Sequence, residues 1–369
     1  MPRLYRVCKD VYTLLPRRNT FSNANVNIIK GKANILIDTG SANDPNFNYL
    51  TKILSALKIK TIDKIIITHS HIDHCQNLGQ FADKFGAELF AHKNAIPILK
   101  HERSIEGFGF WELLEEAYPR IHQSHLIRRL ITIGYNYFVY RGEKKIEKIM
   151  PLEEGDIISD LEVLFVPGHS SDSIALVDKE KHCIFTGDMI PWTPYIHTTI
   201  DDFRNSIRKI LDYSQRYDIK TMIRGHQRPI DAKIEKANYH LFLKDMDIAE
   251  WRILKLLKLK KELTARNMLP YVFKRTHFIH NLLYRVLMRT QLFWIIKYLQ
   301  NLEDKHRKDI EQLRKELKYN ILEELSQSNP PYATVNLRTK KVSLDIDEQD
   351  GLRFPRYEKR EKNKRNGGD

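Results

Sequence analysis

The chain is poor in cysteine and lacks long apolar runs. Only three of its 369 residues are cysteines, Cys8, Cys75 and Cys183, too few for a disulfide framework, so we expect a reducing cytoplasm. No apolar run approaches the roughly 20 residues of a membrane helix, and the charged N-terminal residues show no apolar core of a secretory signal. The mean hydropathy of -0.48 also argues against an integral membrane protein. With 42% hydrophobic residues, the chain can still bury a sizeable core.

Acidic residues are in deficit, with 47 Asp and Glu against 61 Lys and Arg, a net charge of +14. The excess is concentrated in residues 236–300, where 13 Lys and Arg against 4 Asp and Glu leave a net charge of +9, with aromatic residues between them. Basic residues neutralise phosphates and aromatic rings stack on bases, so this segment favours RNA as a partner. The solvated basic face of a helical bundle and a membrane-surface helix are the alternatives.

Short runs rich in β-branched residues recur before residue 235, and each ends at a turn that carries His or Asp. The runs are 34–37, 65–67, 161–166, 184–185 and 221–223, and they are followed by Asp38, His69, His169, Asp188 and His226. This pattern predicts strands. Because strand ends are rigid, side chains placed there can converge on one site.

Four metal-binding side chains, His69, His71, Asp73 and His74, lie within six residues. Imidazole and carboxylate groups favour zinc, iron and manganese. The later strand ends bring the set to seven candidate ligands: His69, His71, Asp73, His74, His169, Asp188 and His226. Two divalent ions would need such a set, because the carboxylates partly balance their charge. A chance cluster of histidines would not place the three later residues after predicted strands.

These motifs resemble those of the metallo-β-lactamase superfamily. HSHIDH at 69–74 is similar to its HxHxDH signature, and IDTG at 37–40, PGHS at 167–170, TGD at 186–188 and GH at 225–226 are similar to its other motifs. The resemblance covers residues 5 to 235. It implies an α+β fold, a four-layer αβ/βα sandwich with the site at one edge.

The resemblance also implies a role for each residue. His69, His71 and His169 would hold one metal ion, Asp73, His74 and His226 would hold the other, and Asp188 would bridge them. Asp38 would orient a ligand without touching metal. The implied cofactors are two divalent ions, zinc first, with iron or manganese as alternatives. A water that bridges them would be a hydroxide near neutral pH and would attack a carbonyl carbon or a phosphorus, with Asp73 also accepting or shuttling a proton.

Two groups of the superfamily share this motif arrangement. The chain resembles glyoxalase II-like enzymes, which cleave thioesters, and enzymes like β-lactamase-like protein 2, which cleave single-stranded RNA. We therefore expect a metal-dependent hydrolase of an ester, a thioester or another small carbonyl compound, with a single-stranded RNA endonuclease as the alternative. A non-catalytic binding protein is disfavoured because no ligand is missing. A flavin-linked di-iron protein is disfavoured because the C-terminal part has no βαβ pattern.

The composition predicts three parts. Residues 1–235 form the hydrolase domain, with an insertion at about 103–150. Residues 236–328 form a basic helical domain, for which the second group of relatives suggests a winged-helix-like arrangement. Residues 329–369 form a charged, disordered tail. Apolar spacing predicts helices at 236–261, 264–275, 281–302 and 304–327.

Overall fold

A computed structural model of the chain describes most of its N-terminal two thirds. The described residues are 3–16, 24–41, 46–100, 125–127, 129–130, 133, 146, 148–191, 193, 196–259, 268, 272, 294–295, 297–299, 301, 333–336 and 341–344. They belong to two units, Met1–Ile310 and Glu311–Asp369. Most of the predicted insertion, and most of the helices predicted beyond residue 261, lie outside the described residues.

The first sheet has seven strands in chain order. An antiparallel meander of β1 (Arg3–Cys8), β2 (Val11–Leu15), β3 (Val26–Ile29) and β4 (Ile35–Ile37) continues into the parallel strands β5 (Lys64–Ile67), β6 (Glu88–His92) and β7 (Met150–Leu152). The helices between these strands are α1 (Asn46–Ala56), α2 (Ile72–Cys75), α3 (Leu78–Phe85) and α4 (Ala95–Lys100). Parallel pairing places the carboxyl ends of β4 and β5 at the same edge of the sheet.

The second sheet has six strands in the order β13-β12-β11-β10-β9-β8. They are β8 (Ile157–Ile158), β9 (Leu161–Phe165), β10 (Ile174–Asp178), β11 (Cys183–Gly187), β12 (Thr221–Arg224) and β13 (Ile230–Asp231). The parallel pair β11 and β12 is joined by helix α8 (Ile200–Arg216), whose start is stabilised by a capping box between Thr199 and Asp202. All five predicted strands are therefore present, within a few residues of their predicted bounds.

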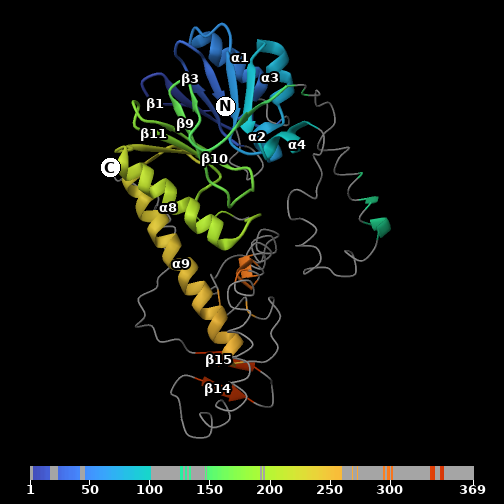
Figure 1. Cartoon of the computed structure of the whole chain (residues 1–369), viewed down its shortest axis with the longest axis vertical. Helices are drawn as coiled ribbons and strands as arrows, with labels where there is room; N and C mark the ends of the chain where they lie inside the picture. Colours follow the sequence, from blue (N-terminus) through green and yellow to red (C-terminus); the bar gives the residue numbers. More distant parts are fainter. Residues whose placement is uncertain are drawn as a thin grey trace, which may run out of the picture. The chain divides into compact units, whose positions relative to one another are not determined.

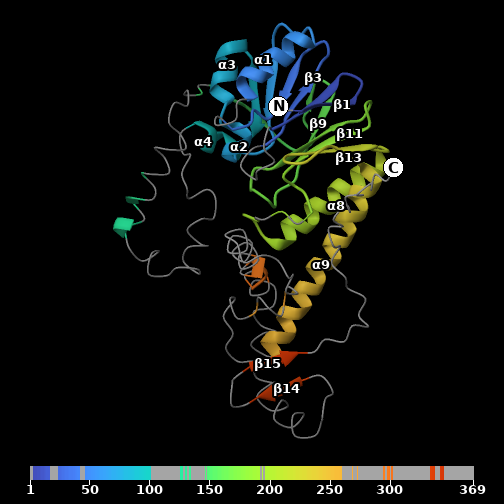
Figure 2. The same ribbon diagram turned by 180° about the vertical axis from the view of Figure 1, so that it is seen from behind.

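Two apolar cores hold the layers together. Leu36 and Ile65 pack toward α1 and α3, whereas their neighbours Ile37 and Ile66 pack toward the second sheet. Alternate residues of a strand point to opposite faces, so a strand buried on both faces reads as a continuous apolar run. Figures 1 and 2 show α1 and α3 outside the first sheet and α8 and α9 (Ala232–Leu259) outside the second. The predicted four-layer sandwich is confirmed.

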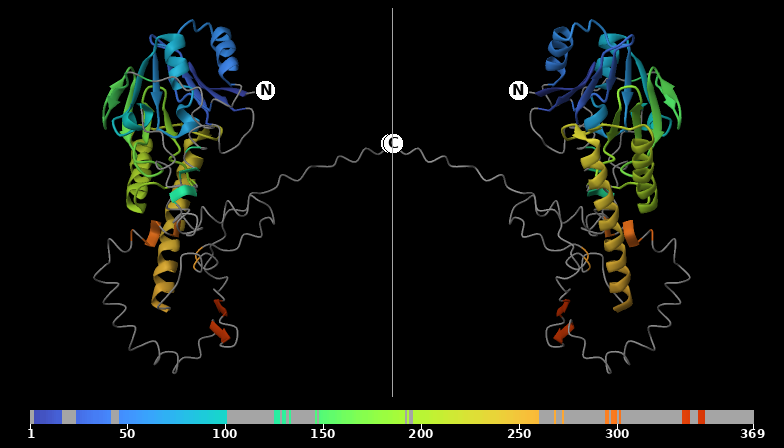
Figure 3. Two further views of the ribbon diagram at one scale, coloured as in Figure 1. Left: turned by 90° about the vertical axis from the view of Figure 1, so that its right-hand side faces the viewer. Right: turned by 90° about the vertical axis from the view of Figure 1, so that its left-hand side faces the viewer.

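Helix α9 confirms the helix predicted at 236–261. It begins at Ala232 and therefore crosses the predicted domain boundary at 235/236. Its first half is anchored, because Tyr239 and Phe242 are buried and the Tyr239 hydroxyl donates to the carbonyl of Met189. Figure 3 shows the rest of α9 running beyond the sheets. The division into domains and the winged-helix-like arrangement stay predictions. Among the described helices, none is long and apolar enough to cross a membrane.

The second unit contains a hairpin inside the segment predicted to be disordered. Strands β14 (Ala333–Asn336) and β15 (Lys341–Leu344) pair antiparallel, with Val335 opposite Val342. The charged composition of 329–369 masked these two short β-branched stretches, which pair with each other across a short connection. The rest of the predicted tail lies outside the described residues.

Candidate metal centre

The candidate ligands follow strands whose carboxyl ends meet at one edge of the two sheets. His69 comes after β5, His169 after β9, Asp188 after β11 and His226 after β12. The short helix α2 adds Asp73 and His74, and His71 occupies its N-cap position. Each candidate ligand thus lies within a helical turn or a few residues beyond a strand, which holds its backbone in place.

All seven predicted side chains come together in overlapping groups. Ligand atoms lie within 4.8 Å of one another in three groups: His69, His71 and His169; His69, His74 and Asp188; Asp73, His74 and His226. The first and third groups are those that the family resemblance implies for the two metal ions. Binding of metal by these residues stays a prediction.

Asp188 lies between the two groups. Its Oδ2 is 3.0 Å from Nε2 of His226 and 3.5 Å from Nε2 of His169, and its Oδ1 is 3.4 Å from Nε2 of His74. One carboxylate therefore reaches histidines of both groups. This is the geometry expected of a bridging ligand.

Two imidazole rings are oriented by Asp38 and Thr68. Asp38 is buried and accepts from Nδ1 of His74 at 2.8 Å and from the backbone N–H of Thr68 at 2.8 Å. The Thr68 hydroxyl donates to Asp38 at 2.8 Å, so its oxygen is left to accept from Nδ1 of His69 at 3.1 Å. Both rings therefore turn Nε2 into the cluster. Asp38 would support two candidate ligands through these contacts, and that role stays a prediction.

Three further supports were missed from the sequence. The Thr193 hydroxyl contacts Nδ1 of His169 at 3.0 Å, and Asp172 accepts from the backbone N–H of Ser70 at 2.8 Å. The side-chain amide of Asn25 donates to carbonyls on both sides of His226, at 2.8 and 2.7 Å. Asp172 lies three residues after His169, just beyond the PGHS motif, so its closeness to the motif was a usable signal. Thr193 and Asn25 are remote in sequence from the residues they support.

The histidines of the cluster fall into two groups, one with lowered and one with raised pKa values. Burial, followed by the neighbouring histidines, lowers the pKa of His69 and of His71 well below the usual value. Burial also opposes protonation of His74 and His226, but Asp188 and the other nearby carboxylates outweigh it. They raise the pKa of His74 well above its usual value and that of His226 to about 10. Two imidazoles are therefore cationic in the metal-free cluster at neutral pH.

Asp188 is the anion that these cations face. Burial would raise the pKa of its carboxyl group, but His226 and His74 lower it well below the usual value. The carboxylate thus remains ionised inside the protein. This carboxylate needs positive charge beside it. The two imidazolium rings supply that charge in the metal-free cluster, and metal ions would supply it in the loaded one.

The donor set fits divalent metal ions. The buried Nε2 of His69 has no hydrogen-bond partner among the described residues, and Nε2 of His169 lies only 2.8 Å from Nδ1 of His71. Converging nitrogens of this kind are satisfied by a shared cation. Imidazole and carboxylate donors together suit zinc, iron or manganese.

The cluster is accessible from one side. His71, Asp73 and His226 are half-buried, whereas the other four candidate ligands are buried. On this side Oδ2 of Asp73 lies 3.2 Å from Nε2 of His226. A substrate would therefore meet Asp73 first among the carboxylates.

Gly225 leaves no room for a side chain beside the cluster. A Cβ there would lie 2.1 Å from Oδ1 of Asp188 and 2.8 Å from Cε1 of His74. We expect Gly225→Ala to displace Asp188, to lower the metal content below two ions per chain and to cut hydrolysis at least about a hundredfold, since ångström-scale displacement has such effects. Elemental analysis and turnover would test this, with Gly31→Ala as the control because its Cβ meets only ordinary contacts. Wild-type metal content in the Gly225 variant would contradict the prediction.

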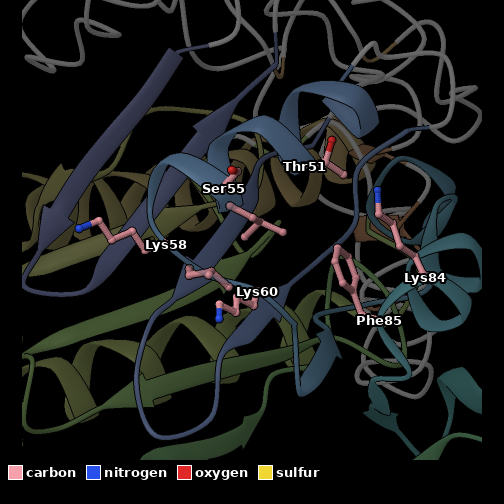
Figure 4. A pocket seen from close by; sticks show the side chains of 8 residues that line it. Thr51, Ser55, Lys58, Lys60, Lys84 and Phe85 are labelled. Atoms are coloured by element: carbon pink, nitrogen blue, oxygen red, sulfur yellow. The ribbon is translucent and has the colours of Figure 1, made fainter.

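A separate hollow lies between α1 and α3, near the amino end of β5 and so away from the cluster. It is lined by Thr51, Leu54, Ser55, Lys58, Ile59, Lys60, Lys84 and Phe85. Figure 4 shows the amino groups of its three lysines pointing in different directions. Its lining has no His, Cys, Asp or Glu, so the metal chemistry belongs to the other edge of the sheet.

Known proteins are similar to this chain over the region that contains the candidate site. The profile of the metallo-beta-lactamase superfamily matches residues 19–226, more than half of the chain, and this range contains all seven candidate ligands. The human acyl-coenzyme A thioesterase MBLAC2 is 25% identical over 223 residues, covering 56% of this chain and 73% of that protein. The beta-lactamase-like protein 2 homolog of Caenorhabditis elegans is 25% identical over 244 residues, covering 66% and 68%.

A solved structure supports the fold. A metallo-beta-lactamase family protein of Thermus thermophilus superimposes with a TM-score of 0.54 at 18% identity, covering 81% of this chain and 95% of that protein. The chain belongs to the metallo-beta-lactamase superfamily and is a metal-dependent hydrolase.

Proposed function

We propose that the seven side chains bind two divalent metal ions, zinc being preferred, and that the chain hydrolyses a thioester or ester of a small acyl compound. The observation that carries this proposal is Asp188, whose carboxylate contacts histidines of both groups at 3.0 to 3.5 Å beside an open side. The similarity to a protein named acyl-coenzyme A thioesterase favours the thioester class.

Two bound ions would make water acidic enough to attack near neutral pH and would stabilise the oxyanion that develops on the carbonyl. Asp73 would accept or shuttle the proton of the attacking water, because its carboxylate lies on the open side, 3.2 Å from His226. Asp38, Thr68 and Thr193 would keep Nε2 of three histidines turned inward during this step. The protein thus supplies orientation, which alone can lower a barrier substantially.

Cleavage of single-stranded RNA is the second candidate, and the net charge of +9 in residues 236–300 favours it. The cluster itself does not choose between a carbonyl and a phosphodiester, because two metal ions serve both. A basic capture surface would make RNA binding fall steeply with salt, as each neutralised phosphate releases counterions.

Parallel assays would separate the two. In one assay, metal-loaded enzyme would be given short acyl thioesters, and the released thiol would be measured with a colorimetric reagent. In the other, it would be given end-labelled single-stranded RNA, and the products would be separated by electrophoresis. We expect thioester turnover that a His69→Ala variant lacks. RNA cleavage by metal-loaded wild type, without turnover of any thioester or ester, would overturn the proposal in favour of the endonuclease. The same His69 variant would exclude a contaminating nuclease.

A further inference from the structure

The two groups expected to hold metal ions each take ligands from both sheets. His69 and His71 follow β5 of the first sheet and share a group with His169, which follows β9 of the second. The other group has only His226, after β12, from the second sheet. The affinity for each ion would therefore depend on how the sheets are held together beside it. We call the two sets the His169 group (His69, His71 and His169) and the His226 group (Asp73, His74 and His226).

Asn94 joins the sheets beside the His169 group. It lies just beyond β6, which pairs in parallel with β5, so its backbone lies at the edge of the sheet that carries His69. Its side-chain amide donates to the carbonyl of Ser171 at 3.1 Å, in the loop between β9 and β10 that carries His169. Asn94 and Ser171 are both exposed, so a substitution at Asn94 leaves the apolar cores intact.

His92, the last residue of β6, strengthens this connection. Its ring is buried and stacks on that of Phe165 at the end of β9, with centroids 4.1 Å apart and an angle of 5° between the planes. Burial lowers the pKa of His92, so the ring is neutral at pH 7 and its Nδ1 accepts from the backbone N–H of Asn94 at 3.3 Å. The end of β6 therefore contacts the second sheet on both sides of His169, at Phe165 before it and at Ser171 after it.

Asn25 makes the equivalent connection beside the His226 group. It directly precedes β3 of the first sheet and is fully buried. Its side-chain amide donates to the carbonyls of Arg224 and Gln227 at 2.8 and 2.7 Å, and its backbone N–H donates to the carbonyl of Gly225 at 2.6 Å. These carbonyls lie on both sides of His226 in the sequence. One asparagine thus joins the sheets beside each group, through the backbone of the loop that carries the ligand.

We propose that Asn94 and Asn25 are positioning residues, one for each metal ion, and that each sets the affinity of its own group without changing the other. The inference rests on the proposed binding of two ions. The amides hold backbone carbonyls next to His169 and His226, and groups that orient a metal ligand tune its affinity. Because the two connections lie at different strands, loosening one leaves the other in place.

The test isolates each group and then removes one amide. His226→Ala leaves the His169 group to bind zinc, and His169→Ala leaves the His226 group. In the first background Asn94→Leu should lower the zinc affinity about 3- to 10-fold, the effect of one hydrogen bond, and Asn25→Leu should change it less than about twofold. In the second background Asn25→Leu should lower the affinity about 10- to 100-fold, because two bonds are lost, and Asn94→Leu should have the small effect.

Competition between the full-length protein and a chromogenic zinc chelator would measure each affinity. Asn94→Gln keeps the amide and should recover part of the affinity. Lys93→Met, the neighbouring control, removes an exposed ion pair with Glu153 and should leave both affinities unchanged. Asn25→Ser, which retains one donor and fits the buried position, replaces Asn25→Leu if the latter does not fold. Circular dichroism would verify the fold of every variant.

Outcomes for the positioning role and for the proposed function are separable. Equal losses in both backgrounds, or unchanged affinities for every variant, would overturn the positioning role while two-ion binding by wild type stands. If wild type binds no zinc, the proposed function fails. In that case, or if a background binds none, hydrogen exchange of the metal-free protein decides. Asn94→Leu should speed exchange in residues 166–173 at least about threefold and leave residues 224–228 unchanged. Equal exchange in wild type and variant would overturn the inference.

Discussion

Replacement of Asp188 by Asn is expected to lower hydrolysis at least about a thousandfold and to reduce the metal content from two ions to one or none. The side chain keeps its shape but loses the charge that contacts His74, His169 and His226. The ion held by His69, His71 and His169 would lose its one carboxylate ligand. The other ion would then lack the second ion beside it. Turnover with the best thioester and elemental analysis of the same sample would measure both effects.

A matched control is Asp212→Asn on α8, which removes an equal charge from an exposed ion pair with Arg216. Exposed pairs contribute little, so this variant should match wild type in turnover and in metal content. Far-ultraviolet circular dichroism should be unchanged in both variants, because Asp188 follows β11 and does not pack in the core. Full activity of Asp188→Asn with two bound ions would show that the carboxylate does not bridge them.

Metal affinity is expected to rise steeply with pH, up to about 100-fold per unit for the two ions together, with about two protons released per chain. In the metal-free cluster the pKa of His74 is well above its usual value, and that of His226 is about 10. The ring of His226 therefore holds a proton throughout the range from about pH 6 to pH 8, and the raised pKa of His74 favours its protonated form as well. A metal ion needs the neutral ring and must displace that proton, so lower pH strengthens the competitor and weakens metal binding.

Calorimetric titration of the metal-free protein in two buffers with different ionisation enthalpies would count the released protons. His226→Ala should release about one proton fewer. His197→Gln should release the same number as wild type, because burial and His169 lower the pKa of His197 to about 3 and its ring is already neutral. Heats that do not depend on the buffer would show that the metal-free cluster is not protonated as described.

The sequence by itself determined the superfamily and predicted the seven candidate ligands. HSHIDH concentrates four donors in six residues, and the other three follow runs of β-branched residues that read as strands. Strand ends are local features of the sequence, so these positions could be recognised without knowing how the strands pair. The same reasoning found Asp38, because it ends such a run. It did not find β1, β2 or β6, since these strands end at no motif.

Only the tertiary structure decided how the ligands are supported and what lies beside them. Asn25 and Thr193 contact loops that are remote in sequence, and Trp294 reaches Thr193 across 101 residues. Local sequence patterns show which groups can bind metal. Long-range packing decides which neutral and charged groups surround them. Contacts between distant segments leave no periodic signal in a single sequence, so only the tertiary structure shows them.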